Sequence, residues 1–262
     1  KTNAIRGRRT GLGATGVGDT IAMMNMTYGS DESIDFVEKI FKTKKYAEYK
    51  SSIDMAKDRG AFPVFDWELE KDNAFISQLL LDFPELQHDL KKYGRRNISI
   101  STIAPNGSVS TQTQTSSGIE PVFMLSYTRR KKINSSDANA KIDFIDALGD
   151  KWQEFVVYHH GAQQWMDITK EKDLTKSPYY GATAEEIDWQ QRVKLQAAAQ
   201  KHIDHSISST INLPENVSIE KVAEIYETAW KLGLKGITVY RKNSRSGVLI
   251  ENKPSQPTII NK

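Results

Sequence analysis

A short turn carries the residues best suited to binding an anion. It follows residues 98–103, where apolar and small polar residues alternate as in a β-strand. Ligands gather at the carboxyl ends of parallel strands, and a glycine-containing turn can direct successive backbone amides at one anion. A plain strand-ending turn with a capping serine is the competing interpretation, and the pattern alone favours it. The candidate phosphate-binding residues are Ala104, Pro105, Asn106, Gly107, Ser108, Val109 and Ser110, with hydroxyl donors at Ser108, Ser110 and Thr111.

A second glycine-rich segment, residues 11–16, fits the dinucleotide-binding pattern G-x-G-x-x-G. That pattern requires a buried strand immediately before it, whereas residues 6–10 read Arg-Gly-Arg-Arg-Thr. The acidic residue expected about 20 positions later would fall in a segment that looks like a helix start. We therefore interpret residues 11–16 as a helix opening whose glycines permit close packing against a neighbour.

Other polar groups are weaker candidates. Glu120 precedes Pro121, and a structural carboxylate is the more common role for such a residue than a catalytic one. His202 and His205 could share a helical face, but no third metal ligand is evident. The basic run at residues 129–132 could contact phosphates, although a solvated loop is the favoured interpretation. The residues alone therefore indicate no catalytic group and no metal site.

Hydrophobic periodicity predicts long helices that alternate with short strands. The predicted strands are residues 98–103, 206–211 and 237–240. This alternation indicates an α/β architecture with parallel strands. The predicted helices run from the cap at Ser30 to Arg59 with Gly60 as the stop, over residues 73–92 with a break before Pro84, over residues 143–165, from a capping box at Thr183, and from a cap at Ser218 to Gly233.

Composition limits the class of protein. The chain has 262 residues, 38% hydrophobic and 26% charged, with a net charge of +3, as in an ordinary globular protein. No apolar run approaches the ~20 residues that span a bilayer, and the start has no apolar signal core. The mild charge gives no indication of direct nucleic-acid binding. Because the chain has no cysteine, it contains no disulfide, thiolate metal site or catalytic thiol.

Several segments, taken together and in order, resemble ribonucleotide reductases, most closely the adenosylcobalamin-dependent class II. The segment RRTGLGATGVGD resembles the family's helix opening, and SISTIAPNGSVS resembles its phosphate-binding loop. SSGIEPVF followed by YTRR, then ISSTINLP, and finally LKGITVYR with SR, complete the series. These segments occupy residues 8–19, 99–110, 116–123 with 127–130, 207–214 and 234–245.

The resemblance implies a fold and a function. The family builds a ten-stranded α/β barrel and reduces the ribose 2′-carbon of ribonucleotides by thiyl-radical chemistry. Residues 1–250 would form the C-terminal part of that barrel, residues 251–262 a tail or linker, and residues 104–110 the substrate phosphate site. Asn106 departs from the family, which usually has Thr there.

Cofactor and partners are likewise implied by the resemblance. They are adenosylcobalamin, a ribonucleoside di- or triphosphate substrate, an upstream fragment of the same catalytic chain, and a dithiol reductant such as thioredoxin. A cytoplasmic location without membrane contact is expected, and no cobalamin-contacting residue is assigned.

The missing cysteine bears on catalysis too, because the family's radical cysteine and reducing pair lie outside the matched region. The chain is therefore expected to be a piece of a longer enzyme and inactive alone. One alternative is a class I large-subunit fragment, with Tyr179 and Tyr180 structural rather than a radical relay. Another is a non-catalytic interaction module that retains the fold, and a dinucleotide-binding oxidoreductase is a distant third.

Overall fold

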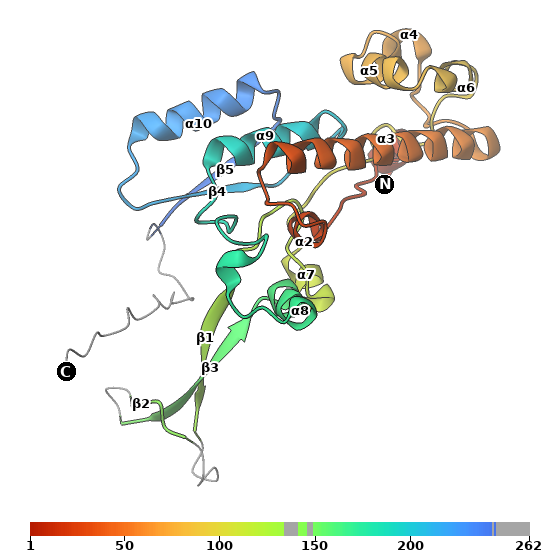
Figure 1. Cartoon of the computed structure of the whole chain (residues 1–262). Helices are drawn as coiled ribbons and strands as arrows, with labels where there is room; N and C mark the ends of the chain where they lie inside the picture. The colour runs from red at the N-terminus through yellow and green to blue at the C-terminus, as the bar shows by residue number, and fades with distance from the viewer. Residues whose placement is uncertain (134–140, 146–148, 243, 245–262) are drawn as a thin grey trace.

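A computed structural model describes residues 1–133, 141–145, 149–242 and 244. The named elements before Ser126 are all helices, three strands follow in succession, and helices and strands alternate only in the last part of the chain (Figure 1). The helices are α1 (Thr2–Gly7), α2 (Val17–Met23), α3 (Asp31–Arg59), α4 (Trp67–Glu70), α5 (Ala74–Asp82), η1 (Pro84–Leu86), α6 (Gln87–Tyr93), α7 (Gly107–Thr113), α8 (His160–Thr169), η2 (Leu174–Lys176), α9 (Trp189–Gln200) and α10 (Ile219–Lys231). The strands are β1 (Ser126–Lys132), β2 (Phe144–Ile145), β3 (Lys151–Tyr158), β4 (Thr210–Leu213) and β5 (Thr238–Arg241).

Parallel segments form the wall of the fold. Leu12 pairs with Ser101, and Ile103 pairs with Ile207, both in parallel. β4 then pairs in parallel with β5. The predicted strand at residues 98–103 thus lies between two parallel neighbours. It is joined to each of them by an isolated bridge and not by a continuous ladder. The strand predicted at residues 206–211 begins a few residues before the observed one, because the regular ladder of β4 begins at Thr210. The expected α/β architecture with parallel strands is confirmed.

The long helix α3 covers this wall. The Ser30 side chain accepts a hydrogen bond from the Ser33 amide at 3.2 Å, and Gly60 ends the helix with φ of 76°. Both ends match the sequence prediction. Val37 and Phe41 pack in one buried cluster with Leu195 and Ala199 of α9. α3 therefore connects the N-terminal segments to the second half of the chain (Figure 1).

A small helical cap of α4, α5, η1 and α6 lies over the C-terminal half of α3 (Figure 1). Asn73 caps α5 by accepting hydrogen bonds from the amides of Phe75 and Ile76. The predicted break before Pro84 is confirmed, since α5 ends at Asp82 and Pro84 begins a 3₁₀ turn. Leu79 and Leu90 are fully buried in the cluster that this cap forms on α3.

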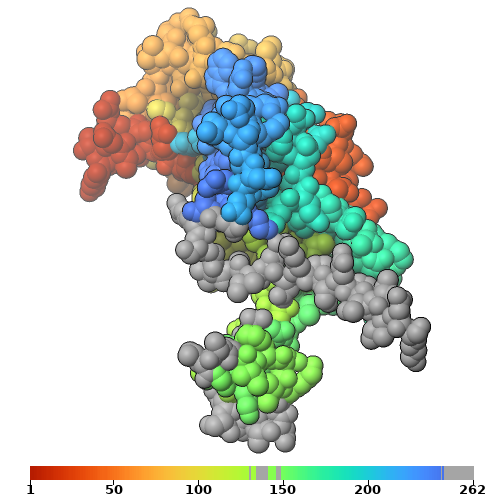
Figure 2. All heavy atoms as spheres, turned by 90° about the vertical axis from the view of Figure 1, so that its left-hand side faces the viewer, coloured from red at the N-terminus to blue at the C-terminus, as the bar shows by residue number. Residues whose placement is uncertain are grey.

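An antiparallel sheet projects from the helices, as Figures 1 and 2 both show. Its strand order is β1-β3-β2. The predicted helix over residues 143–165 is wrong, because its first half forms β2 and β3 and only His160–Thr169 is helical. The basic run at residues 129–132 is also not a loop but part of β1. Residues 151–158 are rich in aromatic and β-branched side chains, and pairing with β1 outweighs their weak helical spacing.

Of the two predicted C-terminal helix starts, one is confirmed and one is wrong. Ser218 caps α10 as predicted, accepting from the Lys221 amide at 3.2 Å. The capping box at Thr183 does not open a helix. The Thr183 hydroxyl donates to Glu186 instead, and α9 starts six residues later under Asp188, whose carboxylate accepts from two first-turn amides. The predicted tail at residues 251–262 lies outside the described residues.

Candidate phosphate-binding site

The candidate turn joins the parallel segment at residues 98–103 to helix α7. Asn106 occupies the N-cap position of α7, but its side chain makes no capping hydrogen bond. The amides of Gly107, Ser108 and Val109 belong to the first turn, where no preceding helical carbonyl can accept from them. Gly107, Ser108 and Val109 are exposed. The turn therefore presents a small group of solvent-facing backbone donors.

The hydroxyl groups of the turn divide into two sets. The Ser110 and Thr111 hydroxyls donate to the Gly107 carbonyl at 2.8 and 2.9 Å. They hold the first turn of α7 together and are not aimed outward, and Ser110 is buried. Ser108 is exposed beside the open amides. Of the three predicted hydroxyl donors, Ser108 is the one that lies in the exposed first turn and does not donate to the Gly107 carbonyl.

Residues 116–118, called the brace below, support the turn on its protein-facing side. The Ser117 hydroxyl donates to Asn106 Oδ1 at 2.8 Å. Gly118 has φ of 57°, and a Cβ there would lie 3.2 Å from Ile103 Cγ2. This left-handed position suits glycine, which lets the returning chain pass close under the turn. The amide group of Asn106 is thus held from the protein side.

The glycine-rich segment lies against this brace. Gly16 caps α2 with φ of 73°, and its amide donates to the Ser116 carbonyl at 2.9 Å. A Cβ on Gly13 would lie 2.9 Å from the Thr102 carbonyl oxygen, and one on Gly18 would lie 2.9 Å from the Glu120 carbonyl oxygen. The close packing at the glycines and the helix start at Gly16 are as predicted, but the first part of the segment is not a helix opening, because Leu12 pairs with Ser101 in the parallel wall.

Glu120 has the structural role that the sequence favoured. Its carboxylate pairs with Arg192, which is 1% exposed, and accepts from the Thr210 amide at 2.9 Å. Burial lowers the pKa of the Arg192 guanidinium. The neighbouring Ile119 carbonyl accepts from the Tyr28 hydroxyl at 2.6 Å, and burial raises the pKa of Tyr28 to about 12. Glu120 therefore joins the end of the brace to α9 and β4.

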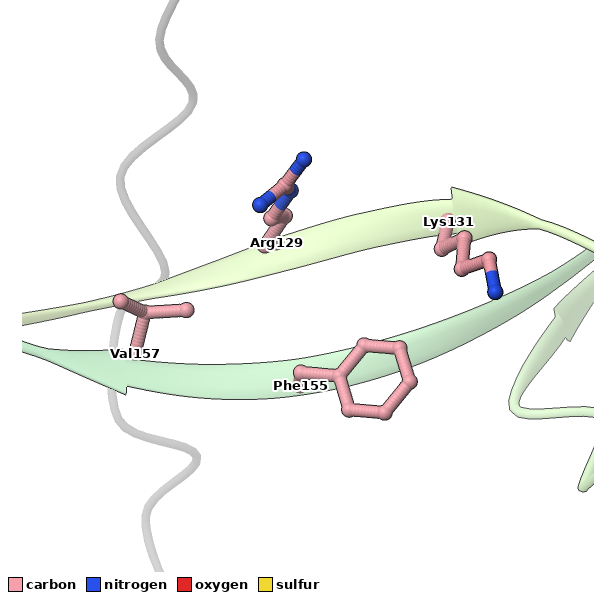
Figure 3. Close-up of a pocket in the computed structure, with 4 residues that line it drawn as sticks. All are labelled: Arg129, Lys131, Phe155 and Val157. Atoms are coloured by element: carbon pink, nitrogen blue, oxygen red, sulfur yellow. The ribbon is translucent and has the colours of Figure 1, made fainter.

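The histidines and the basic run lie apart from the turn. His202 and His205 follow the end of α9 and do not share a helical face. Within the described parts of the chain, no group of three His, Asp or Glu side chains is placed to hold a metal ion. Arg129 and Lys131 line an open cavity of about 400 Å³ with Phe155 and Val157, on one face of the projecting sheet (Figure 3). None of these four residues belongs to the turn or its brace.

The sequence missed one important member of the site. Asp19 is 3% exposed, and its carboxylate accepts from the Ser116 amide at 2.6 Å and from the Tyr179 hydroxyl at 2.9 Å. Both burial and the adjacent carboxylate raise the pKa of Tyr179. Two signals were available: Asp19 ends the segment RRTGLGATGVGD, which resembles the family's helix opening, and it is an acid in the first turn of a helix, which is common for electrostatic reasons.

Parallel bridged segments, one of which leads into the exposed first turn of α7, together with the surrounding helices define an α/β protein. The chain belongs to the ribonucleotide reductase barrel-domain family, whose model matches residues 1–240. The expected family, and the assignment of the chain to part of its α/β barrel, are thereby confirmed.

Individual relatives agree with this family. The chain is 28% identical to a vitamin B12-dependent ribonucleoside-diphosphate reductase of Mycobacterium tuberculosis, over 96% of the chain and 34% of that protein. It is 29% identical to the protein of the same name from Thermoplasma acidophilum, over 97% of the chain and 31% of that protein. The class Id ribonucleotide reductase alpha subunit of Actinobacillus ureae has the same fold, with a TM-score of 0.63 at 21% identity over 92% of this chain and 40% of that one.

The chain spans about a third of the length of these curated relatives. In the part of the chain that the structure describes, no helix is long and apolar enough to cross a bilayer.

Proposed function

We propose that this chain is the C-terminal part of the catalytic chain of a vitamin B12-dependent ribonucleoside-diphosphate reductase, and that residues 104–110 hold the substrate's phosphates. The observation that carries the proposal is the exposed first turn of α7 at the end of a parallel segment. Membership of the reductase barrel family and the names of the relatives support it. Those names favour a diphosphate over a triphosphate substrate.

The turn is suited to phosphate without a cationic side chain. The amides of Gly107, Ser108 and Val109 converge at a helix N-terminus, where unpaired N–H groups and the helix dipole favour negative charge. The Ser108 hydroxyl adds one rotatable donor. Gly107 has no side chain to obstruct the approach, and no atom lies within 4 Å of the position its Cβ would take. In this proposal the turn fixes the phosphate end of the nucleotide, which orients the ribose relative to the rest of the barrel.

The radical step requires groups that these residues do not provide. The chain has no cysteine, so the thiol that reacts and the dithiol that is oxidised belong to other parts of the enzyme. Adenosylcobalamin, when bound, supplies the radical. The open 400 Å³ cavity on the projecting sheet is small for a corrin ring, and its lining of Arg129, Lys131, Phe155 and Val157 contains no feature specific to one. This cavity therefore does not by itself fit the cofactor.

The proposal includes two further partners and a cellular location. They are an upstream part of the catalytic chain that completes the barrel and a dithiol reductant such as thioredoxin, in the cytoplasm.

The test is reduction of an isotopically labelled ribonucleoside diphosphate by this chain with and without an upstream fragment, in the presence of adenosylcobalamin and a dithiol. We expect turnover only with both protein parts. Turnover by this chain alone would contradict the assignment of the thiols to another region. No turnover by the assembled parts, with binding intact, would favour a non-catalytic module.

A class I large subunit is the second candidate, because relatives include plain alpha subunits and the fold matches that of a class Id alpha subunit. The adjacent Tyr179 and Tyr180 have different environments here. Tyr179 is buried and donates to Asp19, whereas Tyr180 is 55% exposed. This arrangement supports a structural role for Tyr179. Activity that does not depend on cobalamin would favour class I.

A further inference from the structure

Asp19 joins three separate segments through one buried carboxylate. Oδ2 accepts from the Ser116 amide at 2.6 Å, and Oδ1 accepts from the Tyr179 hydroxyl at 2.9 Å. His159 Nδ1 lies 3.7 Å from Oδ1. Asp19 itself lies in the first turn of α2, whose N-terminus favours a negative charge. A buried carboxylate with both oxygens occupied is a rigid connection, because leaving either partner unpaired would be costly.

The connection leads directly to the phosphate turn. The Ser116 hydroxyl accepts from the Asp19 amide at 3.2 Å, so the two residues are bonded twice. The next residue, Ser117, donates to Asn106 at the N-cap of α7. The Asp19 carboxylate is therefore linked to Asn106, the residue before the open amides, through Ser116 and Ser117 alone.

We infer that Asp19 is a positioning residue for the nucleotide phosphates, acting through Ser116 and Ser117 on Asn106 and the first turn of α7. The inference rests on the proposed function of residues 104–110. Asp19 does not touch the ligand. It holds residues 116–118 where Ser117 donates to Asn106, so the amides of residues 107–109 remain preorganised for an anion.

The two partners of Asp19 allow the positioning role to be separated from its contribution to stability. Asp19→Ala removes both hydrogen bonds. Asp19→Asn keeps an acceptor for the Ser116 amide, and the Tyr179 hydroxyl can turn to accept from the new NH₂ group. Tyr179→Phe removes only the bond that does not lead to the turn. Ile76→Ala, in the remote α3–α5 cluster, is a control for loss of stability because Ile76 is 2% exposed.

The test measures affinity by equilibrium dialysis on the assembled reductase, with a ribonucleoside diphosphate and with inorganic pyrophosphate, alongside thermal unfolding. We expect Asp19→Ala to weaken binding of both probes about tenfold, and Asp19→Asn about threefold, since a charge-assisted bond to the brace is lost or weakened. Tyr179→Phe and Ile76→Ala should lower the unfolding temperature and change affinity less than about twofold.

Hydrogen exchange gives an independent measurement. In Asp19→Asn, the amides of Ser116 and Gly118 should exchange faster, while in Tyr179→Phe they should not. If Asp19→Ala does not fold, Asp19→Asn still decides the test. Unchanged affinity and unchanged exchange in Asp19→Asn would overturn the inference.

Gly107→Val distinguishes this result from failure of the proposed function. If Gly107→Val weakens binding and the Asp19 variants do not, the turn binds phosphate but Asp19 does not position it. If Gly107→Val has no effect either, residues 104–110 are not the phosphate site.

Discussion

Ser117 donates its hydroxyl hydrogen to Asn106 Oδ1, with 2.8 Å between the two oxygens. Asn106 occupies the N-cap of α7, where an asparagine side chain ordinarily accepts from the helix's own amides. Here Ser117 occupies that acceptor, and the side chain makes no capping bond. The hydrogen bond therefore leaves the first-turn amides available to an external anion, at the expense of helix capping.

Changing Asn106 to Asp tests this arrangement. The carboxylate can still accept from Ser117, but it places a negative charge beside the amides that would meet phosphate. We expect nucleotide affinity in the assembled enzyme to fall about tenfold or more, with a stronger dependence on salt, while stability is unchanged or slightly raised by the favourable helix end. Dialysis at two ionic strengths measures the effect. Asn106→Thr, the residue usual in the family, should bind nearly normally. Equal affinity of the Asp variant would place the phosphate elsewhere.

Gly107 offers a change that separates binding from folding. The space around its Cβ position is open, and its φ is not in the left-handed region. Gly107→Val should therefore fold with little loss of stability but should weaken nucleotide binding about tenfold, because its methyl groups cover the amides. Gly107→Ala should have a smaller effect. Isothermal titration with a ribonucleoside diphosphate, together with thermal unfolding, distinguishes the two properties. A Val variant that binds normally would contradict the proposed site.

The pair of Glu120 and Arg192 predicts a large effect on stability. Glu120→Ala would leave a guanidinium that is 1% exposed without its counter-charge, so the free energy of unfolding should fall by about 3–5 kcal/mol. The double variant Glu120→Gln with Arg192→Met should recover part of this loss, because no buried charge remains. Urea unfolding of the chain measures both. The exposed pair Glu227 and Lys231 is the control, and Glu227→Ala should lower the free energy of unfolding far less, because solvent screens an exposed ion pair. Equal losses in the two Ala variants would refute the prediction.

His202 predicts a pH dependence of stability. The side chain is 5% exposed, and burial followed by the nearby Lys45 ammonium lowers the pKa of His202 to about 4. Among the described residues, neither ring nitrogen has a hydrogen-bond partner. The unfolded chain, with a pKa near 6.5, binds the proton more readily than the folded chain. The free energy of unfolding should therefore rise with pH between about 4 and 6.5, by up to about 3 kcal/mol.

Urea unfolding across that pH range checks the slope. His202→Gln should flatten the dependence, whereas His160→Gln, a change at an exposed histidine, should leave it in place. A slope that persists in His202→Gln would assign it to other groups.

Local signals determined which elements the sequence could predict. Ser30, Gly60, Asn73, Pro84 and Ser218 act on their immediate neighbours, and the structure has the helix ends that they indicate. β3 was missed because its stability comes from pairing with β1, which lies some 20 residues earlier in the chain. Thr183 was misread because its hydroxyl bonds to the Glu186 side chain and not to a backbone amide.

The candidate site divides in the same way. Residues 104–110 were identifiable because the strand, the turn and its glycine are adjacent in sequence. The brace was not, since Asp19 and Ser116 are 97 positions apart and Asp19 and Tyr179 are 160 apart. Nothing in the sequence around Asp19 indicates which amide its carboxylate accepts from.

Helix α3 has a consequence for how the chain unfolds. Its first half supplies Val37 and Phe41 to one buried cluster, and its second half supplies Tyr49 and Ile53 to another. The two clusters share 29 residues of continuous helix, about 44 Å long. Neither can lose its packing without exposing one side of the same helix. The helical cap and the parallel wall are therefore coupled into one cooperative unit, and amide protection should rise and fall along α3 as a whole.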